Sequence, residues 1–338
     1  MNAAGWRGRL ESAVLGLWYG PRWRAWPLVP VSGLYAVIVA LRALPYRWGW
    51  RHPARLPAPV VVVGNITVGG TGKTPLVIHL AQRLAAEGER PGILCRGYGG
   101  RSTHWPCRIA PDSDPRELGD EPVMIARRSG LPVAAGPDRV AAGRLLLAQG
   151  CTVLLCDDGL QHQALARDFE ISVVDGARGL GNGFRLPAGP LRETAQRLKR
   201  VDALVIHGKG FSTERPAYAL DLVLGDTVTP LNGDEARSLA DFVGRRVHAV
   251  AGIGHPQRFF SALRQAGLQV VEHPFPDHYD YRAEDFRAID GVLVMTEKDA
   301  VKCAHFSLPD AWYVPVHVRV DPQLEADVLA RVRQEARW

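Results

Sequence analysis

Short apolar runs alternate with segments of helical periodicity along most of the chain. Between residues 59 and 206, the runs expected to be strands are Pro59–Asn65, Gly92–Cys95, Pro132–Ala135, Thr152–Cys156, Glu170–Val174 and Ala203–Ile206. Helical patterns lie between several of them, at Pro75–Glu87, Glu121–Ser129 and Arg139–Gln149. This order predicts an α/β fold, in which a parallel sheet carries helices on both faces.

A second set of apolar runs follows the first. Its expected strands are Tyr218–Leu224, Val247–Ala251, Val270–Glu272, Val292–Thr296 and Trp312–Val318, and its expected helices are Gln257–Gln265 and the amphipathic segment Pro322–Arg337. No internal repeat is visible. We therefore expect three parts: a leader over residues 1–56, a first domain over 57–205 and a second, smaller α/β lobe over 206–338.

The leader differs from the rest of the chain in composition. The formal net charge is +6, from 41 Lys plus Arg against 35 Asp plus Glu. Residues 1–56 hold eight Arg, no Lys and one acid, Glu11, so that residues 57–338 sum to about −1; the leader also holds six of the nine Trp. A near-neutral body argues against a general nucleic-acid binder. With 46% hydrophobic and 22% charged residues, the chain is not expected to be disordered.

The apolar run Val31–Leu41 is shorter than the ~20 residues that a transmembrane helix needs. It begins too far into the chain for a secretory signal. Trp and Arg on both sides of it favour a helix in the membrane interface, with its rings at headgroup level. The alternative is an N-terminal helix packed on the body. The sequence leaves open whether the helix spans the membrane or lies on it.

Five Cys occur without a CxxC pair and without Cys/His spacing typical of a zinc site. Several lie in or beside apolar runs, where Cys behaves as a small buried hydrophobe. A reducing, cytosolic environment is therefore expected for the body.

The strongest motif, TVGGTGKT, lies between the first strand and the first helix. In a P-loop, glycines allow successive backbone N–H groups to turn toward phosphate oxygens at a helix N-terminus, a lysine reaches the β- and γ-phosphates, and a hydroxyl ligates Mg²⁺. Thr67 stands where the strict GxxxxGK[ST] motif has its first glycine, and we expect neighbouring glycines to supply the turn. The alternative is a glycine-rich turn without a ligand. The predicted nucleotide-binding residues are Thr67, Val68, Gly69, Gly70, Thr71, Gly72, Lys73 and Thr74, the last also a metal ligand.

Acidic residues follow at three further places. Asp157 and Asp158 come directly after an apolar strand, as the metal-side acid of a P-loop enzyme does, although an Asp-Asp-Gly turn gives the same pattern. Asp120 and Glu121 open a helix, where one could accept a hydroxyl proton and the other support the metal; the alternative is an acidic helix cap. His278 lies in a polar turn of the second lobe, and a lone His is more often structural.

These residues favour a kinase over a nucleotide switch. A GTPase reads guanine through an [NT]KxD strand end, and the nearest candidate, residues 296–299, has the wrong spacing. A soluble kinase for a small polar metabolite remains an alternative, against which the Trp- and Arg-rich leader argues.

A series of motifs then identifies a family. In order they are GNITVGGTGKTP (64–75), RGYGG (96–100), GDEP (119–122), AGPDR (135–139), DDGLQH (157–162), GNGFRLPAGPLRE (181–193), AGIGHPQRF (251–259), FPDHYDY (275–281) and TEKDAVK (296–302). Together they resemble the tetraacyldisaccharide 4′-kinases, the lipid A 4′-kinases of Gram-negative bacteria, over essentially the whole chain. The resemblance implies two α/β/α lobes and ATP-dependent phosphorylation of the 4′-hydroxyl of tetraacyldisaccharide 1-phosphate, an anionic glycolipid, to give lipid IVA. It also implies an enzyme at the cytoplasmic face of the inner membrane.

The resemblance assigns roles to particular residues. Lys73 and Thr74 match the ATP and Mg²⁺ residues, Asp120 matches the proposed base, and His278 its partner from the other lobe. Acids near the metal are Glu121 and Asp158, beside Asp157. Positions expected along the phosphate or sugar path are Arg139, Gln161 and His162. Neither the pattern nor the resemblance gives the oligomeric state.

Overall fold

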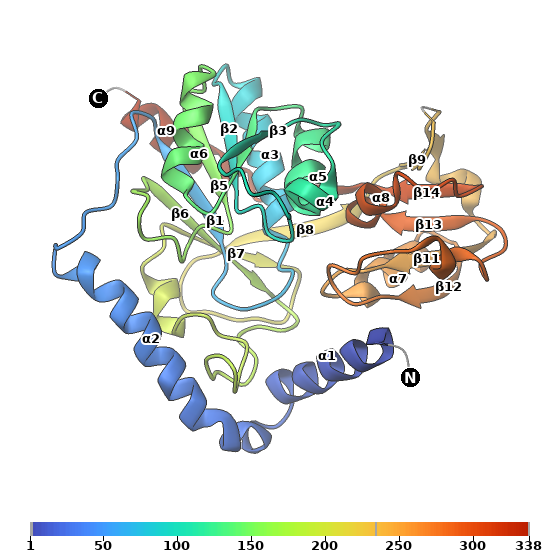
Figure 1. The fold of residues 1–338 in the computed structure, drawn as a ribbon, viewed down its shortest axis with the longest axis horizontal. Helices are drawn as coiled ribbons and strands as arrows, with labels where there is room; N and C mark the ends of the chain where they lie inside the picture. The colour runs from blue at the N-terminus through green and yellow to red at the C-terminus, as the bar shows by residue number, and fades with distance from the viewer. Residues whose placement is uncertain (1–2, 234, 337–338) are drawn as a thin grey trace.

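The structure is a computed structural model that describes residues 3–233 and 235–336. Two separate β-sheets form its core, and a helical leader stands beside them (Figure 1). In the described residues the larger sheet has nine strands, in the order β15-β8-β7-β6-β1-β5-β2-β4-β3. They are β1 (Val60–Gly64), β2 (Pro91–Cys95), β3 (Cys107–Ile109), β4 (Val133–Ala135), β5 (Val153–Asp157), β6 (Phe169–Asp175), β7 (Ala203–His207), β8 (Tyr218–Leu224) and β15 (Val316–Val320).

Neighbouring strands from β4 to β8 are parallel, and only the edge strands β3 and β15 are antiparallel to their neighbours. Helices cover both faces, because the strands are apolar on both sides. Val61 and Val63 of β1 pack with α3 (Lys73–Ala86), α5 (Asp120–Ser129) and α9 (Pro322–Glu335), whereas Val60 and Val62 pack with α6 (Arg139–Ala148). The expected α/β class is confirmed.

The smaller sheet has the order β10-β9-β14-β13-β11-β12 in the part of the chain that is described. Its strands are β9 (Thr227–Pro230), β10 (Arg237–Ser238), β11 (Arg246–Ala251), β12 (Gln269–Pro274), β13 (Leu293–Thr296) and β14 (Ala311–Val314), and its helices are α7 (Pro256–Gln265) and α8 (Glu297–Cys303). The remaining short elements are α4 (Pro115–Leu118) and the 3₁₀ helices η2 (Ala195–Lys199), η3 (Leu239–Phe242) and η4 (Ala283–Phe286).

The division between the two lobes is not where the sequence placed it. β8 and β15 were expected in the second lobe, but they pair antiparallel with each other at the edge of the nine-stranded sheet. The chain crosses to the second lobe after β8 and returns in β15, so residues 227–314 form that lobe and α9 packs on the first. The expected strand Trp312–Val318 is divided at Pro315, which has no N–H to donate to a ladder.

The leader consists of α1 (Ala3–Tyr19), η1 (Arg22–Leu28) and α2 (Val29–Arg47). Residues 22–47 form 26 continuous helical residues, long enough and apolar enough to cross a membrane. The helical segment is thus longer than the apolar run Val31–Leu41, on which the expectation of a helix too short to span rested. Pro30 fits the first turn of α2, and neither Arg42 nor Pro45 ends the helix before Arg47.

One side of the leader docks on the loop between β6 and β7. The hydroxyl of Ser32 donates to the carbonyl of Arg185 at 2.8 Å and accepts from the amide of Ala188 at 3.0 Å. The indole of Trp18 donates to the carbonyl of Pro187 at 2.9 Å. The same loop continues into Leu191, which forms a bridge with Thr67 at the start of the TVGGTGKT loop.

Candidate active site

The TVGGTGKT loop follows β1 and ends at α3, as the sequence predicted. Gly69 and Gly72 have φ of +114° and +92°, a conformation that side chains other than glycine rarely adopt. The helix begins at Lys73, so the loop amides and the positive end of the helix dipole face the same region. The amide of Val68, in contrast, already donates to the carbonyl of Pro190 at 2.8 Å and holds the start of the loop in place.

Thr74 and Asp157 meet below this loop. The Thr74 hydroxyl donates to Oδ2 of Asp157 at 2.9 Å. Oδ1 of Asp157 and the hydroxyl of Thr71 are buried and have no hydrogen-bond partner among residues 3–233 and 235–336. Burial and the nearby charges of Glu121 and Asp158 raise the pKa of Asp157 to about 7. A buried carboxylate beside a hydroxyl and other acids is a donor set that suits Mg²⁺.

Asp158 has the opposite environment, although it is the next residue. Both oxygens of its carboxylate accept from Nη1 of Arg192, Oδ2 at 2.8 Å and Oδ1 at 3.0 Å. Oδ1 also lies 3.6 Å from Nζ of Lys73. Burial acts to raise its pKa, but the charges of Lys73 and Arg192 lower it to about 2. Asp158 is therefore ionised and holds the two cations, whereas Asp157 keeps a free oxygen.

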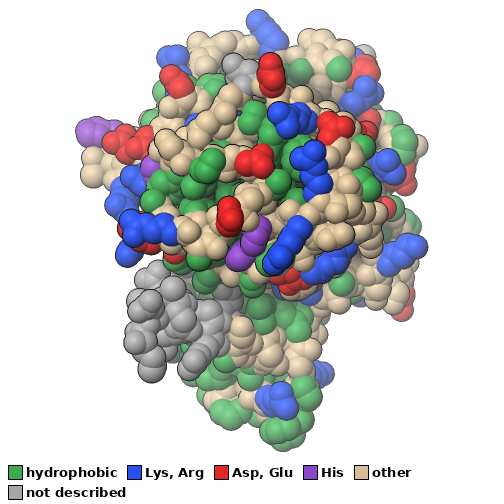
Figure 2. Space-filling model, turned by 90° about the vertical axis from the view of Figure 1, so that its right-hand side faces the viewer, with side chains coloured by type: hydrophobic (Ala, Val, Ile, Leu, Met, Phe, Trp, Pro, Cys, Tyr) green, Lys and Arg blue, Asp and Glu red, His purple; other side chains and the backbone are tan. Residues whose placement is uncertain are grey.

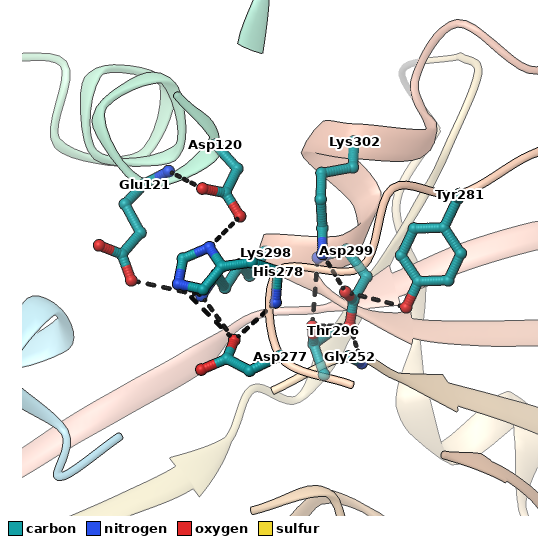
Figure 3. Close-up of polar contacts among 10 residues, drawn as sticks. All are labelled: Asp120, Glu121, Gly252, Asp277, His278, Tyr281, Thr296, Lys298, Asp299 and Lys302. Atoms are coloured by element: carbon teal, nitrogen blue, oxygen red, sulfur yellow. Dashed lines mark hydrogen bonds and ion pairs between the residues drawn. The ribbon is translucent and has the colours of Figure 1, made fainter. Parts of the chain in front are cut away.

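Asp120 and His278 form an ion pair between the lobes (Figure 3). Oδ2 of Asp120, at the start of α5, lies 3.2 Å from Nδ1 of His278, in the turn after β12. The contact with Asp120 raises the pKa of His278. Burial opposes ionisation of Asp120, but the contact with His278 and the charge of Lys298 lower the pKa of Asp120 to about 2. The structure thus brings together two residues that are 158 positions apart.

Lys298 is a site residue to which the sequence analysis gave no role, although it lies in the motif TEKDAVK and in the guanine-motif candidate with the wrong spacing. It lies in the first turn of α8, directly after β13, and its ammonium contacts Glu121, Asp277 and His278 (Figure 3). Burial alone would lower the pKa of Lys298, but the charges of Glu121 and Asp277 raise it. The available signal was its position at the carboxyl end of a buried strand, where side chains of α/β enzymes meet their ligands.

The three expected substrate residues are placed differently from one another. Arg139 is only 2% exposed, and its Nη1 donates to the carbonyls of Cys95 and Gly136 at 2.6 and 2.7 Å. It therefore braces two strand ends instead of lining an open path. Gln161 is exposed, and its amide donates to Glu193 at 2.7 Å, beside Arg192. Burial lowers the pKa of His162, whose Nε2 has no partner in the described part of the chain.

A second contact joins the lobes on the other side of the TVGGTGKT loop. Arg258 of α7 binds Asp175, at the end of β6, with Nη2 and Oδ1 2.5 Å apart. Arg178 donates to the carbonyl of Gly254 at 3.0 Å. A Cβ at Gly254 would lie 3.1 Å from the amide nitrogen of Gly70, so only a glycine fits well there. The second lobe thus contacts the first both at the start of α5 and beside the TVGGTGKT loop.

Comparison with known proteins identifies the family to which this arrangement belongs. The family model described as LpxK, tetraacyldisaccharide-1-P 4′-kinase, matches residues 24–333. The chain belongs to this family. The tetraacyldisaccharide 4′-kinase of Alkalilimnicola ehrlichii is 54% identical over 317 residues, which cover 92% of this chain and 95% of that protein. The corresponding protein of Nitrosococcus oceani is 49% identical and covers 97% of this chain and 96% of its own length.

A solved structure agrees with the assignment. The LpxK of Aquifex aeolicus, an "apo" form in complex with ATP, is 29% identical with a TM-score of 0.77 and covers 92% of this chain and 99% of that one. The resemblance inferred from the motifs is confirmed, and the chain is an LpxK-family kinase.

Proposed function

We propose that this kinase transfers the γ-phosphoryl group of ATP to the 4′-hydroxyl of tetraacyldisaccharide 1-phosphate, which forms lipid IVA in lipid A biosynthesis. Family membership supports the reaction, since relatives that match nearly their whole length carry this name. The observation that carries the assignment to residues is the Asp120–His278 pair, which lies between the lobes beside Glu121 and Lys298.

The nucleotide site is assigned to the loop between β1 and α3. Its glycines with positive φ, the helix start and Lys73 fit the phosphates of ATP. Thr74 and Asp157, with Asp158 and Glu121 nearby, would hold Mg²⁺, because the orphaned oxygen of Asp157 fits a hard cation. When bound, Mg²⁺ neutralises charge on the phosphates. Lys73 contributes a further positive charge, and Asp158 holds it in place.

Asp120 is the base in this proposal. Its Oδ2 lies 3.2 Å from Nδ1 of His278, and its Oδ1 accepts from the amide of Glu121 at 3.0 Å. The carboxylate is therefore ionised and fixed, and it orients the acceptor hydroxyl and takes its proton as the oxygen attacks the phosphorus. His278 stabilises the position and charge of Asp120, so catalysis requires both lobes in contact.

The leader is assigned to the cytoplasmic surface of the inner membrane, where the glycolipid lies. Large apolar side chains are exposed along it, among them Trp23, Trp26, Leu34, Leu41 and Trp50. Such a surface is costly in water and typical of a membrane contact. At the bottom of Figure 2, hydrophobic side chains lie together with basic ones on the part of the molecule that protrudes from the body.

The decisive experiment is incubation of the full chain with radiolabelled ATP and tetraacyldisaccharide 1-phosphate in mixed micelles. We expect label on the lipid with the native protein and none with Asp120→Asn. A native protein that labels no lipid, but labels a soluble sugar or only exchanges nucleotide, would overturn the proposal in favour of a metabolite kinase or a nucleotide switch.

A further inference from the structure

Lys298 occupies a position that its own helix does not favour. It lies in the first turn of α8, near the positive end of the helix dipole, where a cation is unfavourable. Its side chain is also largely buried, at 13% exposure. Neither feature stabilises α8 by itself. The contacts of the ammonium therefore have to account for the placement.

The ammonium joins groups from both lobes. Nζ of Lys298 lies 3.3 Å from Oε1 of Glu121, which belongs to α5 of the first lobe, and 3.0 Å from Oδ1 of Asp277, in the turn after β12 of the second. A third contact, at 3.3 Å, reaches Nε2 of His278. The carboxylates of Glu121 and Asp277 accept from two of the three N–H groups of the ammonium, and Nε2 of His278 lies beside the third.

We propose that Lys298 is a positioning residue, which ties Glu121 to the turn of Asp277 and thereby holds His278 against Asp120. The expected effect on kcat rests on the proposed function, whereas the expected effect on the turn at Asp277 does not depend on the substrate. Without the ammonium, Glu121 and Asp277 would be two carboxylates with no shared cation, and their repulsion would move the turn away from α5.

A neighbouring ion pair provides a control that distinguishes positioning of His278 from attachment of the two lobes to each other. Arg128 of α5 binds Glu297 of α8, with Nη1 and Oε2 2.8 Å apart. Glu297 precedes Lys298, and its ion pair joins the same two helices without contacting Asp120 or His278. The helices α5 and α8 therefore stay linked when Lys298 is replaced, and Glu297→Gln is a matched control that weakens the interface only.

The kinetic test compares Lys298→Met, Lys298→Arg and Glu297→Gln in the full chain. Displacement of a catalytic group by 1 Å can cost ~100-fold in rate, so we expect Lys298→Met to lower kcat by about that factor. The KM for ATP should stay near the native value, because the loop between β1 and α3 is not in contact with Lys298. Lys298→Arg should restore much of the loss, and Glu297→Gln should remain close to native. A loss in Lys298→Met no greater than in Glu297→Gln overturns the inference.

A second measurement needs no substrate. Hydrogen exchange of the turn at residues 275–280 should be faster in Lys298→Met than in the native protein, and unchanged in Glu297→Gln. If Lys298→Met does not fold, Lys298→Gln, which keeps a donor and removes the charge, takes its place. Unchanged exchange in a folded variant overturns the inference, whereas a native protein inactive on the glycolipid would overturn only the proposed function.

Discussion

At the scale of single residues, environment separates carboxylates that the sequence presents alike. Asp157 and Asp158 are adjacent, yet burial and nearby acids raise the pKa of the first to about 7, while two cations lower that of the second to about 2. The sequence predicted that both are near the metal. It could not divide their roles, because Arg192 reaches Asp158 from a loop 34 residues away.

The base assignment makes the first prediction. Asp120→Asn keeps the size of the side chain but removes its ability to take a proton. General-base catalysis contributes typically ~10²–10⁴-fold, so kcat should fall by that order while ATP binding stays unchanged. Steady-state kinetics and calorimetric titration with ATP check this. A variant that keeps more than half of the native kcat would contradict the assignment.

The raised pKa of Asp157 predicts that the stability of the fold depends on pH. Because its folded-state pKa of about 7 lies above the unfolded value, the carboxyl favours the folded state when protonated, and this contribution is lost as the pH rises toward and through 7. In EDTA, Asp157→Asn should therefore have a higher Tm than the native protein at pH 8, and the difference should shrink toward pH 5.

Substitution of Asp158 is the matched control, and its expected effect on Tm has the opposite sign. Asp158 has a lowered pKa, so its ionised form stabilises the fold at pH values above its unfolded pKa. Asp158→Asn should have a lower Tm than the native protein at pH 8. Equal changes in Tm for the two substitutions at pH 8 would contradict the opposite pKa shifts of Asp157 and Asp158.

At the scale of elements, periodicity located most strands and helices but not their partners. The predictions of β1, β5 and α3 were correct, because continuous apolar runs and a glycine-rich turn are compatible with few other secondary structures. β8 and β15 were assigned to the wrong lobe, since an apolar run does not show which sheet it joins. His278 and Asp120 belong to different lobes, so no local pattern pairs them, and only the resemblance did.

The glycine before α5 allows the position of this helix to be tested. Gly119 has a φ of +95°, and a Cβ there would lie 2.7 Å from the carbonyl oxygen of Tyr98. Gly119→Ala should shift the helix start and with it Asp120, so kcat should fall, by ~100-fold for a displacement near 1 Å. Steady-state kinetics measures the fall in kcat, and thermal unfolding measures the change in stability.

The other end of the same helix supplies the control. Gly130 also has a positive φ, of +65°, but no atom lies within 4 Å of an added Cβ. Gly130→Ala should lower stability by about 1–2 kcal/mol, the cost of a left-handed conformation, and leave kcat near native. Equal kcat values for the two variants would mean that the start of α5 does not position Asp120.

At the scale of the molecule, three parts meet around the loop between β1 and α3. The second lobe approaches it at Gly254, where an added Cβ would lie 3.1 Å from the amide nitrogen of Gly70, and the leader docks on the loop that also carries Arg192. Tyr35 of α2 donates to the carbonyl of Arg192 at 3.4 Å, so the leader is attached to the residue that binds Asp158. Helix α2 and the loop between β1 and α3 are therefore connected through the loop between β6 and β7.

The two sides of α2 allow membrane binding to be tested without disturbing this attachment. Ser32 and Tyr35 face the body, whereas Leu34, Ile38 and Leu41 are at least half exposed. The triple substitution of these three residues by Gln should release the protein from anionic vesicles, since each leucine-sized side chain contributes ~1.5–3 kcal/mol when buried. ATP binding should persist, and activity should fall only with substrate embedded in vesicles. Val243→Gln, an exposed apolar residue of the second lobe, is the control. If the triple variant floats with vesicles as the native protein does, α2 is not the membrane contact, and the apolar residues of α1 and η1 become the surface to substitute.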